Sequence, residues 1–324
     1  MSKKPSGLSA AAAFERPLLL TKGQLSFSFY LSQAGRLLLL FLTGTSVVAV
    51  FLIFVFIIRE AIPFIREEGL RELFTGLGWY PARDPHEFGG LPLIVGSVYV
   101  TVGAILIAGP FGLVTAAFLS DIVPFWFRQI VKPVVELLAA IPSVAYGFFA
   151  ILVFAPFLQE KLGIASGANI LNASCLLAAM ALPTIVSVAE DAMTAAGSDL
   201  RAASYALGAT RAETVFKTVI PAAHNGIIAA LMLGIMRAIG ETMVVWMAAG
   251  NAPQIPAPWW DITVPVRTIT ATVAAEMAET PHGSVHFHGL FALGLMLLVF
   301  TFIMNLVTEY FLRRVKKKSG GMKI

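Results

Sequence analysis

Residues 37–58 read LLLLFLTGTSVVAVFLIFVFII, a stretch of 22 residues without a charged side chain. As an α-helix it would be about 33 Å long, enough to cross a hydrocarbon core of about 30 Å. A secretory signal peptide is the competing interpretation, but its apolar region is usually about 7–15 residues long and precedes a small-residue cleavage site. This run is longer, follows a long polar lead-in and precedes no such site. We therefore expect it to remain as a transmembrane helix.

The composition favours a membrane protein. Of the 324 residues, 57% are hydrophobic and 13% are charged, whereas about 25% are charged in an ordinary soluble domain. Such a hydrophobic content excludes a disordered chain. The single cysteine, Cys175, excludes a disulfide scaffold because it has no partner within the chain.

Five further apolar stretches are long enough to span a membrane. Prolines inside them are tolerated where neighbouring helices satisfy the freed carbonyl groups, which indicates a packed bundle. No alternating ten-residue strand pattern occurs, so an outer-membrane barrel is excluded. The predicted fold is all-α, a polytopic membrane helix bundle with six transmembrane helices. The predicted spans are residues 37–58, 91–120, 134–158, 170–189, 225–250 and 289–308.

Lysine and arginine residues are unevenly distributed between alternate loops. With the N-terminus placed inside, 16 of the 23 basic residues fall in cytoplasmic segments, in agreement with the positive-inside rule. We therefore expect both termini in the cytoplasm. The expected organisation is a cytoplasmic segment 1–36, a transmembrane domain 37–312 and a basic tail 313–324.

The longest internal cytoplasmic connection, residues 191–224, carries helix signals that a plain loop would lack. Ser198 can cap a first helix, and Gly208 stands where a helix C-terminus favours a left-handed residue. Thr210 and Glu213 have the spacing of a capping box that opens a second helix. An amphipathic pair of this kind can rest on the membrane surface or dock a soluble partner. Periodicity alone leaves both interpretations open.

The small residues in this segment resemble the EAA loop of ABC importer permeases. The resemblance rests on Ala202-Ala203-Ser204 followed by Gly208, and on TVIP at 218–221. In that family the loop fits a cleft on a cytoplasmic ATPase and couples the ATPase to the membrane domain. Ala202 stands where the family has a glutamate, and Pro221 is expected to turn the chain before the fifth span. The resemblance implies these coupling residues: Ala202, Ala203, Ser204, Gly208, Thr210, Glu213 and Pro221.

Longer stretches resemble the PstC-type permease subunits of bacterial phosphate importers. They are FGGLP at 88–92, IPSVAYG at 141–147, ALGATR at 206–211, RAIGETM at 237–243 and GNAP at 250–253. The resemblance implies a type I ABC importer permease of MetI-like fold, which moves phosphate across the bacterial inner membrane by alternating access. It also implies a homologous PstA-like permease, two PstB-like ATPase subunits and an extracytoplasmic PstS-like phosphate-binding protein as partners.

ATP hydrolysis is expected on a partner subunit rather than on this chain. The sequence contains no GxxxxGK[ST] loop to cradle a nucleotide. No nucleophile–base arrangement is visible in the spans, so we expect no catalytic residue and no enzyme activity. The resemblance implies that ATP and magnesium are used by the ATPase subunits, and that this chain binds no cofactor.

Arg237 and Glu241 are the two charged residues of the predicted fifth span. At a spacing of four residues they would share one helix face, and each charge costs roughly 2.5–3.5 kcal/mol at a helix centre. One interpretation is an ion pair within the helix that lowers this cost. The other is that both line a translocation path, with the guanidinium suited to phosphate oxygens and the glutamate limiting how tightly the anion is held. The resemblance supports the path, because the matching residues are implicated in phosphate passage.

The remaining polar residues give weaker indications. His282, His286 and His288 lack a strong metal-ligand spacing, so we expect a solvated cluster and no metal site. Trp259 and Trp260 are typical of interface anchors on the outer side. Two alternatives stay open for the function: a permease for another oxyanion such as molybdate or sulfate, and an ion-coupled secondary transporter with Arg237 and Glu241 as a proton relay.

Overall fold

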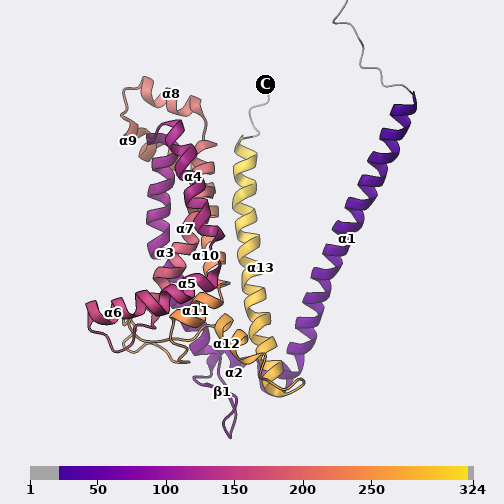
Figure 1. Ribbon diagram of the computed structural model, residues 1–324, viewed down its shortest axis with the longest axis vertical. Coiled ribbons are helices and arrows are strands. Elements are labelled where there is room, and N and C mark those ends of the chain that lie inside the picture. Colours follow the sequence, from indigo (N-terminus) through magenta and orange to yellow (C-terminus); the bar gives the residue numbers. More distant parts are fainter. Residues whose placement is uncertain (1–21, 320–324) are drawn as a thin grey trace, which may run out of the picture. The chain divides into compact units, whose positions relative to one another are not determined.

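The computed structural model describes residues 22–319 (Figure 1). The predicted cytoplasmic segment 1–36 lies outside the described residues up to residue 21, and the basic tail 313–324 does so from residue 320. The chain divides into two compact units, Met1–Phe56 and Ile57–Ile324. The described part of the first unit is entirely helical. It belongs to helix α1 (Lys22–Glu67).

The predicted all-α fold with six membrane-spanning helices is confirmed. Within residues 22–319, six helical segments are long and apolar enough to cross a membrane. Their bounds are Ser32–Glu67, Leu91–Ile122, Ser143–Leu162, Ile170–Thr194, Arg211–Ile239 and Val285–Phe311.

The second unit combines long helices with short helical pieces. Before the core it contains α2 (Gly69–Thr75) and a hairpin of β1 (Trp79–Tyr80) and β2 (Glu87–Phe88), in which Trp79 lies opposite Phe88. The helices that follow are α3 (Leu91–Ala117), α4 (Phe125–Ala140), α5 (Ser143–Phe149), α6 (Ala155–Leu162), α7 (Ile170–Thr194), α8 (Ser198–Ala206), α9 (Arg211–Thr214), α10 (Ile220–Ile239), α11 (Met243–Ala248), α12 (Ile269–Glu276) and α13 (Val285–Ser319). Three π-helical turns, η1 (Phe118–Ile122), η2 (Ala150–Phe154) and η3 (Val215–Val219), continue α3, α5 and α9.

The two ends of this unit carry different elements. Figure 1 shows α8 and α9 together at one end, while α12 and the β-hairpin lie at the opposite end. α3, α7 and α10 run between the two ends. This arrangement separates the predicted docking helices from the predicted outer loops, as two sides of a membrane would require.

The centre of the unit is held together by close packing of α7 against α3 and α10. Gly112 of α3 and Gly234 of α10 both face Ile185 of α7. A Cβ atom at either glycine would lie 2.7 Å from an Ile185 methyl carbon. Membrane helices associate through such close approaches at small residues, because lipid supplies no hydrophobic driving force between them.

The third predicted span, 134–158, is wrong as a continuous helix. The chain is extended at Ile141 and Pro142, so α4 ends at Ala140 and α5 begins at Ser143. The cause is the proline, which disfavours the helical conformation of the residue before it. The helix long enough to span is Ser143–Leu162, and α4 precedes it as a separate amphipathic helix.

The fifth predicted span, 225–250, is also wrong in its bounds. One helical segment runs from Arg211 to Ile239 and includes Pro221, so the helix does not start anew at the proline. The π-turn η3 pairs carbonyl groups with N–H groups five residues on. The missing N–H of the proline therefore does not end the helix. The connection predicted at 191–224 is correspondingly shorter, because α7 continues to Thr194.

Candidate functional site

The fifth membrane helix ends between Arg237 and Glu241, the two charged residues of the predicted fifth span. α10 stops at Ile239, Gly240 follows it, and α11 begins at Met243. The carbonyl oxygen of Glu241 accepts a hydrogen bond from the Thr270 hydroxyl at 2.7 Å. Residues 240–242 therefore form a break between two helices, and part of its hydrogen bonding is supplied by another segment of the chain.

The break changes the relation between Arg237 and Glu241. Arg237 is exposed on α10, whereas Glu241 is half-buried beyond the helix end. Among the described residues neither side chain takes part in an ion pair, so the predicted shared helix face and the intrahelical ion pair are wrong. The helix that would have aligned them ends at residue 239. Tyr146 of α5 lies within electrostatic range of the Arg237 guanidinium, and its hydroxyl donates to the Leu138 carbonyl at 3.0 Å.

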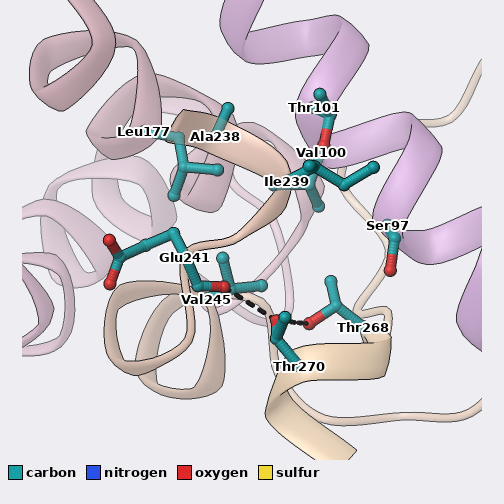
Figure 2. A pocket seen from close by; sticks show the side chains of 10 residues that line it. All are labelled: Ser97, Val100, Thr101, Leu177, Ala238, Ile239, Glu241, Val245, Thr268 and Thr270. Atoms are coloured by element: carbon teal, nitrogen blue, oxygen red, sulfur yellow. Dashed lines mark hydrogen bonds between the residues drawn. The ribbon is translucent and has the colours of Figure 1, made fainter. Parts of the chain in front are cut away.

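A small polar cavity lies beside the break. Its volume is about 10 Å³, close to the space needed by one water molecule. Hydroxyl groups of α3 and of the segment entering α12 line it, from Ser97, Thr101, Thr268 and Thr270. Glu241 also lines this cavity, and Figure 2 shows its carboxylate pointing away from Thr268 and Thr270.

The predicted docking helices are present at the opposite end. Gly208 is left-handed, with φ +81°, at the turn between α8 and α9. The Thr210 hydroxyl accepts from the Glu213 N–H at 3.3 Å, and the Glu213 carboxylate accepts from the Thr210 N–H at 3.1 Å. This confirms the predicted capping box. Ser198 does not cap α8, because left-handed Gly197 occupies the cap position and Ser198 is already the first helical residue.

α8 and the helix beginning with α9 form a surface hollow. Ser204 is buried, and its hydroxyl lies 2.9 Å from that of Thr214, which joins the two helices. The hollow has a volume of about 490 Å³. Leu207 and Phe216, which are 89% and 68% exposed, are apolar side chains of the same two helices. The residues lining the hollow are Leu200, Ala203, Ser204, Leu207, Gly208, Ala209, Glu213, Lys217 and Thr218.

The pKa of Glu213 is lowered to about 2. The largest cause is the hydrogen bond from the Thr210 N–H, followed by those from Lys217 and from the Thr210 hydroxyl. Glu213 is therefore charged at any physiological pH, with the negative charge at the helix start where the macrodipole favours it.

Two buried ionic groups attach this end to the membrane helices, and the sequence analysis did not identify either. Arg201 of α8 pairs with Asp121 at the end of η1, and its guanidinium also donates to the carbonyls of Met193 and Gly197, both at 2.8 Å. Glu190 of α7 is fully buried and pairs with Arg128 and Lys132 of α4.

Lys132 shows how tightly α4 and α7 are joined. Burial alone would lower the pKa of Lys132, but hydrogen bonds to Glu190 and Asp191 outweigh this effect and raise it. Its ammonium group lies 2.7 Å from Glu190 and 2.9 Å from Asp191.

At the end opposite to α8 and α9, Glu276 is the centre of a polar group. Its carboxylate accepts from Trp79 Nε1 at 2.9 Å and pairs with Arg267 at 2.7 Å and His286 at 2.8 Å. Burial alone would raise the pKa of Glu276. The hydrogen bonds from His286 and Trp79 and the Arg267 charge outweigh it, so the pKa is lowered.

The histidines are not the solvated cluster that was predicted. His286 binds Glu276, His288 lies 2.8 Å from the Glu60 carbonyl oxygen, and the His282 ring packs on Phe287. No group of three potential metal ligands occurs within residues 22–319. Trp259 and Trp260 are exposed on the loop before α12 and pack edge to face.

Residues 108–317 match the family described as binding-protein-dependent transport system inner membrane component. The chain belongs to this family. The probable ABC transporter permease protein YqgH of Bacillus subtilis (strain 168) is 39% identical to it, over 76% of this chain and 78% of YqgH. The phosphate transport system permease protein PstC of Mesorhizobium japonicum is 36% identical, over 76% of this chain and 80% of that protein.

The fold of this binding-protein-dependent permease agrees with a solved relative. The inward-facing MetNI methionine ABC transporter contains a chain that matches 69% of this one and 96% of its own length, with a TM-score of 0.50 and 19% identity. At this identity the likeness establishes the MetI-like fold alone. The sequence-based resemblance to PstC-type permeases is confirmed by the PstC relatives. The chain is a multi-pass inner membrane protein.

Proposed function

We propose that this chain is the permease subunit of an ATP-driven importer that moves inorganic phosphate across the inner membrane by alternating access. The observation that carries the proposal is the identity with proteins named phosphate transport system permease PstC, at 36% over 80% of the Mesorhizobium protein. In this proposal both termini are cytoplasmic, because 16 of the 23 basic residues then fall in cytoplasmic segments, and the end that carries α8 and α9 also faces the cytoplasm.

The break after α10 supports a translocation role for Arg237 and Glu241. Arg237 is exposed and without an internal acid partner among the described residues, so its guanidinium is available to a phosphate oxyanion, which it can bind through two parallel N–H groups. The Glu241 carboxylate, which points away from Thr268 and Thr270, limits how tightly the anion is held. Weak binding is what a transport site requires, because the ion must also leave it.

The hollow between α8 and α9 supports docking of an ATPase subunit. It combines an apolar lining with a rigid capped turn, and Arg201 and Asp121 connect it directly to the membrane helices. Ala202, Ala203, Ser204, Gly208, Thr210, Glu213 and Pro221 are the coupling residues in this proposal. The complex would contain a second, PstA-like permease, two PstB-like ATPase subunits and a PstS-like phosphate-binding protein. This subunit has no enzymatic role, and the ATPase subunits use ATP and magnesium.

Reconstitution of the complete importer in liposomes tests the function. Phosphate-loaded binding protein should stimulate ATP hydrolysis and drive phosphate uptake, and sulfate or molybdate should do neither. Stimulation by sulfate or molybdate but not by phosphate would identify another oxyanion as substrate. Uptake that follows an ion gradient without ATP would instead establish a secondary transporter.

A further inference from the structure

Helix α12 lies against the break that contains Glu241. Thr268 caps its start by accepting from the Ala271 N–H at 3.3 Å, and Thr270 donates to the Glu241 carbonyl at 2.7 Å. The Ile269 N–H donates to the Ser97 hydroxyl of α3 at 3.0 Å. The first turn of α12 is thus fixed between α3 and the break.

The other end of α12 is fixed by Glu276. This residue joins α12 to the β-hairpin through Trp79 and to α13 through His286, and it also pairs with Arg267, which precedes the helix. The Thr280 hydroxyl donates to the Glu276 carbonyl at 2.6 Å. Four separate segments therefore meet at the C-terminal end of a helix of eight residues.

The hydrogen bond from the Thr270 hydroxyl to the Glu241 carbonyl differs from the other hydrogen bonds of residues 240–242, because its donor comes from a distant segment. Within residues 22–319, the other hydrogen bonds of residues 240–242 stay inside α10 and α11: Gly240 N–H to Met236, Glu241 N–H to Ala238, and Trp246 N–H to the Thr242 carbonyl. The Glu241 carbonyl lies beyond the end of α10, and within residues 22–319 no backbone N–H donates to it. The Thr270 hydroxyl supplies the donor from outside, so it fixes the position of the Glu241 backbone relative to α3 and α12.

We propose that Thr270 is a positioning residue for Glu241, and that α12, anchored at Glu276, keeps the outer end of the protein in fixed relation to the translocation path. The link to transport rests on the proposed function. The positioning itself does not, because it concerns only how the break is held.

Hydrogen exchange tests the positioning without any substrate. The complete importer, in nanodiscs and without nucleotide, is compared with three variants. Thr270→Val keeps the shape of the side chain but removes the hydroxyl, and Thr270→Ser restores it. Thr272→Val is the matched control, because Thr272 is also buried in the same helix and its hydroxyl donates to the carbonyl of the N-cap residue Thr268 rather than to the break.

We expect amides 240–246 to exchange about fivefold faster in Thr270→Val, since one net hydrogen bond is lost. They should exchange at the normal rate in Thr270→Ser and Thr272→Val. Glu276→Gln, which weakens the anchor at the far end, should accelerate the same amides by a smaller factor. Normal exchange in Thr270→Val, or equal acceleration in Thr272→Val, would overturn the proposal.

Phosphate uptake by the reconstituted importer tests whether Thr270 acts through Glu241. Thr270→Val should lower the uptake rate about fivefold, but should have no further effect when combined with Glu241→Gln, because coupled residues are not additive. Effects that multiply would show that Thr270 acts by another route. If the normal importer takes up no phosphate while the exchange result holds, the proposed function is wrong and the positioning stands.

Discussion

Replacing Arg201 with methionine should destabilise the chain far more than an ordinary ion-pair substitution. The Arg201 side chain is 17% exposed and that of Asp121 is 2% exposed. Methionine keeps most of the apolar stem but leaves the Asp121 carboxylate buried without its cation, and removing one partner of a buried pair costs about 3–5 kcal/mol. The Met193 and Gly197 carbonyls also lose their guanidinium donor.

Lys217→Met provides the matched control. Lys217 and Glu213 form an exposed pair near the start of the helical segment Arg211–Ile239, with side chains 74% and 46% exposed. Such a pair contributes about 0–1 kcal/mol. The two variants therefore lose the same kind of charge but should differ by about 2 kcal/mol or more in free energy of unfolding.

The assay is reversible unfolding of the purified chain in mixed detergent micelles, titrated with the denaturing detergent. Asp121→Asn added to Arg201→Met should recover part of the loss, because the unpaired charge is then removed. The reasoning is refuted if Arg201→Met and Lys217→Met are equally stable, or if the double variant is less stable than Arg201→Met alone.

Three further predictions concern the path and the docking turn. Arg237→Gln should abolish phosphate uptake in the reconstituted importer while size-exclusion chromatography still shows an assembled complex; normal uptake would remove Arg237 from the path. Glu213 has a pKa lowered from 4.5 to about 2, so its stabilising effect should be complete above pH 4.5 and fall as the pH drops toward 2. The difference in melting temperature between the normal chain and Glu213→Gln should thus be constant from about pH 5 to 8 and shrink in more acidic buffer; a difference that grows below pH 4.5 would contradict this sign. Gly208→Ala forces a side chain into the left-handed region at φ +81°, so it should cost about 1 kcal/mol of stability, and an unchanged melting temperature would show that the turn relaxes freely.

The sequence was sufficient to predict the class of fold and the capped turn, because both depend on local patterns. Six long apolar stretches predict six membrane helices whatever their neighbours are. A Thr-x-x-Glu capping box likewise makes its bonds within four residues, and those of Thr210 and Glu213 were found as predicted.

The helix ends were harder to predict because they depend on partners that are distant in the sequence. Glu241 lies outside α10, and its carbonyl accepts a hydrogen bond from Thr270, 29 residues away. The four-residue spacing from Arg237 therefore does not place the two side chains on one helix face. Pro221 gave a wrong helix boundary for a different reason: the π-turn η3, which precedes it, allows the helix to continue through the proline. At Pro142, by contrast, the rule for the residue before proline would have found the break in the third span.

The buried ion pairs at the docking end were missed for the same reason. Arg201 and Asp121 are 80 residues apart in the sequence, and Asp121 reads simply as the first charge after an apolar span. The sequence does contain one signal: the acid at the end of the second span and the arginine in the segment 191–224 are both predicted on the cytoplasmic side. Only the tertiary structure pairs them.

The packing around Ile185 has a consequence for how such permeases can diverge. Its methyl groups occupy the space that a side chain would need at Gly112 and at Gly234, on two different helices. A mutation that enlarges either glycine can therefore become acceptable only after Ile185 has become smaller. A smaller residue at 185 would in turn leave a void until a glycine is replaced. We expect these three positions to change in a fixed order during evolution, so that the history of one constrains the substitutions open to the other two.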